Sequence, residues 1–169
     1  LKVNSGRDRW TFFLASIFMG AHWITYFYAL KLSNVAIGML SFFTFPLIIA
    51  LLEPIFTRIK FDPMHVLLGI IVLIGIFILA PEFDLKSNQL QGVLLGVLSA
   101  VCYSIRILIL KTHATNYNGT MLMFYQVGIL AIVLMPSLYF LGSSNIKTQY
   151  PYVLLLALLT TAIGHTLFI

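Results

Sequence analysis

The chain has 169 residues, of which 60% are hydrophobic and 9% charged, and its mean hydropathy is +1.01. These values exclude a soluble globular domain and an intrinsically disordered chain, and they predict an all-α, polytopic bundle of transmembrane helices. The formal net charge of +5 does not indicate nucleic-acid binding, because the ten Lys and Arg residues are scattered singly between apolar runs, as the positive-inside rule explains.

Six apolar runs follow one another along the chain, and each has about the length that a helix needs to cross a bilayer core of about 30 Å. We expect membrane spans at about 10–31, 34–57, 64–80, 90–111, 119–141 and 151–169. The sequence starts at Leu1 and stops within an apolar run, so we interpret it as an internal piece of a longer protein.

Basic residues in the short connections indicate the orientation of the spans. If the spans alternate in direction, one side of the membrane holds Lys2, Arg7, Arg9, Arg58, Lys60 and Lys111, and the other holds Lys31, Lys86 and Lys147. Because the side richer in Lys and Arg is normally cytoplasmic, the start of the chain is predicted to be cytoplasmic.

Sequence motifs of nucleotide-driven or hydrolytic chemistry are absent. No Walker-type glycine loop, HExxH, CxxC or GxSxG pattern occurs, so we expect no enzyme activity, no cofactor and no metal site. Cys102 is the only cysteine, and it lies inside an apolar run.

Polar side chains within the spans are the candidates for function, because such groups are costly in a bilayer and usually face the bundle interior. His22 lies near the middle of its span, Tyr26 shares its helix face, and His165 lies at a similar depth in the last span. Together with Tyr103 and Gln126, these residues are predicted to bind the substrate. Two alternatives remain for each His: a neutral ring bonded to a neighbouring helix, or a group that exchanges a coupling proton.

A second set of residues is predicted to shape or gate the bundle. Pro46 falls near mid-span, where the missing amide favours a kink. Gly92 and Gly96 belong to a stripe of small residues spaced by four, which serves either fixed helix packing or a surface on which helices slide. Glu53 and Arg106 lie at similar depth and could form an ion pair; alternatively, each reaches interfacial water or headgroups.

Four stretches carry a family resemblance through their order and spacing: Tyr26–Lys31, Phe45–Leu47, Leu67–Phe77 and Gly92–Arg106. They resemble the EamA group of the drug/metabolite transporter superfamily. The resemblance implies ten spans in two inverted repeats of five, with the last three spans of the first repeat in residues 1–89 and the first three of the second in 90–169. The sequence departs from many relatives after its second span, where Arg58 and Lys60 stand in place of an acidic residue.

These features predict a secondary transporter that exports a small organic solute across a lipid bilayer, the bacterial cytoplasmic membrane, by alternating access. One alternative is a membrane scaffold or sensor that transports nothing, and a weaker one is an integral membrane enzyme acting on lipid-like substrates. The sequence leaves open the solute, proton coupling and the oligomeric state, for which a homodimer is one alternative.

Overall fold

The computed structural model describes residues 6–57, 63–79, 87–113 and 117–134. All regular structure within them is helical, in the order α1 (Gly6–Leu32), α2 (Val35–Phe42), α3 (Phe45–Thr57), α4 (Pro63–Leu79), α5 (Asn88–His113) and α6 (Gly119–Leu134). The predicted all-α fold class is confirmed. The sixth predicted span and the end of the fifth lie outside the described residues.

Three helical segments are long and apolar enough to cross a membrane, namely Gly6–Leu32, Val35–Thr57 and Asn88–Thr112. Two shorter apolar helices, Pro63–Ile78 and Gly119–Val133, accompany them. Large apolar side chains are exposed along the outside of every helix, a surface that lipid rather than water would cover. The chain is therefore an integral membrane protein.

The connection between α1 and α2 is a tight hairpin, formed by Ser33 and Asn34. Lys31 lies in the last turn of α1, where the carbonyl end of a helix favours a positive charge. The amide of Ser33 still bonds to the Ala29 carbonyl at 3.0 Å. Asn34 then caps α2, because its side-chain oxygen accepts a hydrogen bond from the Ile37 amide at 2.9 Å.

The second span is a broken helix, with α2 and α3 separated by a turn at Phe43 and Thr44. Pro46 has no N–H for the Phe42 carbonyl, so the α-helical ladder cannot run through this point. The Thr44 side chain donates instead to the Ser41 carbonyl at 2.7 Å. Pro46 lies in the first turn of α3, where a missing amide costs no helical bond. The predicted kink is thus present, immediately before the proline.

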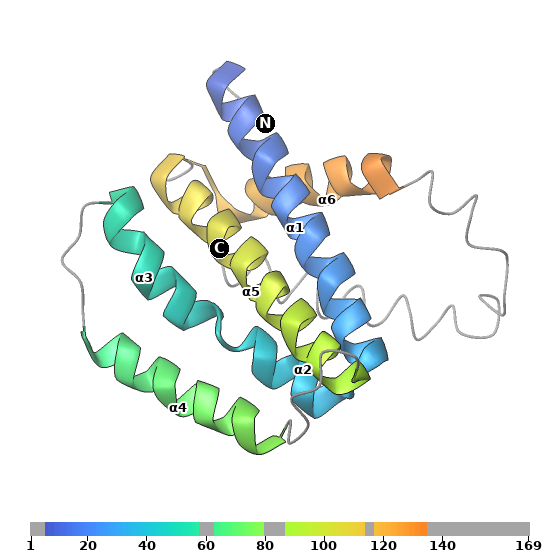
Figure 1. Ribbon diagram of the computed structural model, residues 1–169. Coiled ribbons are helices and arrows are strands. Elements are labelled where there is room, and N and C mark those ends of the chain that lie inside the picture. The colour runs from blue at the N-terminus through green and yellow to red at the C-terminus, as the bar shows by residue number, and fades with distance from the viewer. Residues whose placement is uncertain (1–5, 58–62, 80–86, 114–116, 135–169) are drawn as a thin grey trace, which may run out of the picture.

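In Figure 1, α5 lies in the middle of the bundle. It packs against α1, α2 and α3, while α6 crosses α1 and α4 packs on the outer side of α2 and α3. Phe12 of α1, Leu110 of α5 and Leu122 of α6 share one buried apolar cluster. Met19 and Met123 extend the contact between α1 and α6. The centre of this arrangement is therefore walled by α1, α5 and the α2–α3 break.

Glycines allow α5 to approach its neighbours closely. A Cβ atom on Gly92 would lie 2.5 Å from the Ser33 side chain, and one on Gly96 would lie 2.5 Å from the Ser41 Cβ. Carbon atoms do not approach this closely, so only glycine fits at either position. Two glycines of the stripe predicted from the four-residue spacing thus lie where α5 approaches the α1–α2 hairpin and α2 closely.

Candidate substrate site

Five ring-bearing side chains from three parts of the chain meet at the α2–α3 break; we call them the aromatic cluster. They are His22 and Tyr26 of α1, Phe42 and Phe45 on either side of the break, and Tyr103 of α5. The His22 ring centroid lies 4.9 Å from that of Phe42 and 5.0 Å from that of Tyr103. Tyr26 is 5.4 Å from Phe42, and Phe45 is 5.1 Å from Tyr103. These distances are those of rings in direct contact.

Ser99 of α5 positions the imidazole of the aromatic cluster. The His22 Nδ1 lies 2.7 Å from the Ser99 Oγ, and the same hydroxyl lies 3.2 Å from the His22 carbonyl oxygen. Ser99 is fully buried and His22 is 5% exposed. This bond between helices is one of the two arrangements that the sequence left open for His22, and it fixes the ring against α5.

A buried polar pair lies beside the aromatic cluster. The Arg106 Nε donates to the Gln126 Oε1 at 2.7 Å, which links α5 to α6. The Cζ of Arg106 lies 5.6 Å from the Tyr103 ring centroid, within cation–π range. Arg106 is 2% exposed and Gln126 is fully buried. Among the described residues, Gln126 is linked to the predicted site through Arg106 and Tyr103.

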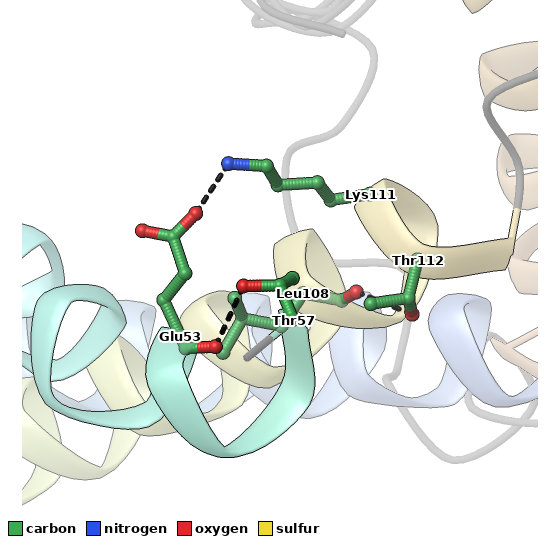
Figure 2. Close-up of polar contacts among 5 residues, drawn as sticks. All are labelled: Glu53, Thr57, Leu108, Lys111 and Thr112. Carbon is green, nitrogen blue, oxygen red and sulfur yellow. Dashed lines mark hydrogen bonds and ion pairs between the residues drawn. The ribbon is translucent and has the colours of Figure 1, made fainter. Parts of the chain in front are cut away.

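The ion pair considered between Glu53 and Arg106 does not form. Figure 2 shows Glu53 of α3 in an ion pair with Lys111 of α5, while Arg106 bonds to Gln126. The side chains of Lys111 and Glu53 are 52% and 23% exposed. Arg106 is buried within the bundle, so its side chain does not extend along the outer surface of α5. Thr57 does not join the ion pair, because its hydroxyl donates to the Glu53 backbone carbonyl at 2.8 Å.

The structure brings together three of the predicted binding residues, His22, Tyr26 and Tyr103, and His165 lies outside the described residues. Phe42, Phe45 and Ser99 were missed, because nothing distinguishes them from other residues of their type in an apolar span. The proximity of Phe45 to Pro46 was the only available signal. Within the described ranges, no group of three or more His, Cys, Asp or Glu side chains could hold a metal ion.

A known protein family matches the part of the chain that contains α1 to α4. Residues 1–80 match the model of the EamA-like transporter family. This part of the chain is therefore similar to EamA-like transporters. No curated protein and no solved structure matches the chain. The EamA-like part supplies His22, Tyr26, Phe42 and Phe45, whereas Tyr103 comes from α5, beyond the matched residues. The activity that the family indicates is membrane transport.

Proposed function

We propose that the chain is the central part of a secondary transporter, and that the aromatic cluster binds a small organic solute. The observation that carries this proposal is the α2–α3 break, which lies against buried polar and aromatic side chains of two other helices. Broken helices near mid-membrane form the substrate sites of many secondary transporters, because their freed backbone groups are available to ligands. A passive anchor needs neither the break nor a buried histidine.

The chemistry of the aromatic cluster fits a solute with a ring. Tyr26, Phe42 and Tyr103 offer ring faces and edges for stacking. His22, held by Ser99, can donate or accept a hydrogen bond according to its tautomer. Since the rings are now in mutual contact, a solute would enter when α1 and the α2–α3 segment separate from α5, as alternating access requires.

The proposal extends to direction and membrane. Two inverted repeats, divided near residue 89, would rock about this site and export the solute across a bacterial cytoplasmic membrane. His22 is the described group best placed to exchange a proton with the site. Uptake into vesicles with and without an imposed pH gradient separates proton coupling from facilitated diffusion.

The test compares two histidines of the full-length protein in proteoliposomes. His22→Ala removes the buried ring from the aromatic cluster and should lower transport of ring-bearing solutes by about tenfold or more. His65→Ala is the matched control, because His65 is exposed on α4, and it should transport like the native protein. Native transport by the His22 variant, with equal amounts of protein in the vesicles, would overturn the site assignment.

A further inference from the structure

Arg106 is a buried cation within a membrane-spanning helix, and its surroundings leave part of its guanidinium unused. Its Nε donates to the Gln126 Oε1, and its guanidinium also lies against Tyr103. The Arg106 Nη2 and the Gln126 Nε2 are both buried and have no hydrogen-bond partner. A buried donor without a partner is costly, and a cationic one more so. Two such donors on adjacent side chains indicate a site that a ligand completes.

The described residues provide no counter-ion for Arg106. Two carboxylates lie within the described ranges, and both are engaged elsewhere: Asp8 accepts from the Tyr117 hydroxyl at 2.6 Å, and Glu53 pairs with Lys111. The three other acidic residues lie outside the described residues, in the stretches between predicted spans; they are Asp62, Glu82 and Asp84. A positive charge in a membrane interior is retained where an anion or water meets it.

We infer that Arg106 and Gln126 bind the carboxylate of a monoanionic solute whose ring occupies the aromatic cluster. This inference rests on the proposed transport function and specifies its substrate class. Tyr103 connects the two parts, because its ring contacts both His22 and the Arg106 guanidinium. The solute therefore carries its carboxylate on a short linker from its ring. A carboxylate oxygen would accept from the Arg106 Nη2 and the Gln126 Nε2 together.

Charge decides between a carboxylate and a phosphate. Arg106 brings one positive charge, and the Gln126 amide to which it bonds carries none. A carboxylate neutralises that charge, whereas a phosphate monoester carries about −1.5 to −2 at pH 7 and would leave excess negative charge in a dry environment. The site therefore favours a monoanion.

The test uses the full-length protein in detergent and in vesicles, with three pairs of probes. The carboxylates N-benzoylglycine, 3-phenylpropionate and indole-3-acetate are each compared with their uncharged amides, by titration of binding and by uptake. The native protein should bind the carboxylates about tenfold to a hundredfold more tightly than the amides. If no probe of either charge binds, the proposed ring site fails. Equal binding of acids and amides would overturn only the inference about Arg106.

Two variants test whether a preference for carboxylates comes from Arg106 and Gln126. Arg106→Gln should abolish the preference for carboxylates while amide binding persists. Lys111→Gln is the matched control, since it removes a cation from the same helix that already has a carboxylate partner; the preference should survive. Retention of the preference in the Arg106 variant would contradict the inference.

Gln126→Glu keeps the test valid if Arg106 variants fail to fold. A carboxylate at position 126 gives Arg106 a permanent counter-ion, so the thermal unfolding temperature should stay the same or rise. The same change should lower binding of the carboxylate probes about tenfold or more and lower amide binding much less. If the pair only joined α5 to α6, the substitution would leave the carboxylate preference unchanged, and the inference would fail.

Discussion

At the scale of single residues, the bond between His22 and Ser99 is the contact most open to measurement. Ser99→Ala removes the partner of the His22 Nδ1 in an apolar environment and should lower the free energy of unfolding by about 1–3 kcal/mol. Thermal unfolding in detergent measures this change, and transport should fall with it because the ring is no longer fixed.

Ser16→Ala is the control for that prediction. Ser16 is as fully buried as Ser99, but its hydroxyl donates to the Phe12 carbonyl of its own helix at 2.7 Å. Removing such a bond leaves only a weakly perturbed helix, so stability should hardly change. Equal destabilisation by the two substitutions would show that Ser99 has no special role in holding His22.

Sequence polarity identified some members of the aromatic cluster and could not identify others. His22, Tyr26 and Tyr103 carry polar groups inside apolar runs, which is unusual enough to mark them. The chain contains 14 Phe residues, so nothing singles out Phe42, and only its neighbour Pro46 marks Phe45, until the fold places both at the break. That the aromatic cluster binds a solute stays a prediction.

The sequence could not predict which charged residues form ion pairs with each other. Depth along a span suggested a pair between Glu53 and Arg106, but depth does not say which way a side chain points around its helix. Lys111 lies 58 residues from Glu53 in the sequence and five residues beyond Arg106, where the end of α5 becomes exposed. The rotation of α5 against α3 and α6 decides the pairing.

At the scale of helices, the approach of α5 to α2 depends on the absence of a side chain at Gly96. Gly96→Ala would bring a Cβ within 2.5 Å of the Ser41 Cβ and within 3.3 Å of the Gly38 carbonyl oxygen. Neither group can rotate away, because both are fixed to the backbone of α2. The helices must separate, and stability should fall by about 1–3 kcal/mol, as measured by thermal unfolding.

Gly128 in α6 provides the comparison. It is exposed, and a Cβ added there meets no atom within 4 Å. Gly128→Ala should leave the unfolding temperature unchanged or raise it slightly, since Ala is the better helix former. If Gly96→Ala were as harmless, the stripe of small residues would not be a close interface.

Hydropathy located the helices well because bilayer thickness fixes the length of a span. It could not locate the break between α2 and α3. Pro46 indicates that a helix is interrupted nearby. The turn itself also depends on the hydrogen bond from the Thr44 hydroxyl to the Ser41 carbonyl, and such a bond also forms within unbroken helices. The position of the break relative to His22 is a result of packing.

At the scale of the whole molecule, polar contacts gather at one end of the bundle. Asp8 bonds to Tyr117, joining α1 to α6, and Glu53 pairs with Lys111, joining α3 to α5 (Figure 2). Lys31 lies at the opposite end of α1. Arg7 and Arg9 flank Asp8 in the sequence, so of the exposed basic residues in the described ranges, Arg7, Arg9 and Lys111 lie at the end where α1 starts and Lys31 lies at the other. This arrangement agrees with a cytoplasmic start.

Cysteine labelling tests that orientation directly. In a background with Cys102→Ala, Lys31→Cys and Thr120→Cys each place one exposed thiol at opposite ends of the bundle, since both native residues are exposed. A membrane-impermeant maleimide should label the cysteine at position 31 in right-side-out vesicles and the one at 120 in inside-out vesicles. The reverse pattern would place Lys111, Glu53 and the start of α1 outside the cell. Arg106 lies nearer than His22 to the end of the bundle where α1 starts. The reverse labelling pattern would therefore place a bound carboxylate nearer the outer face of the membrane instead of the cytoplasmic face.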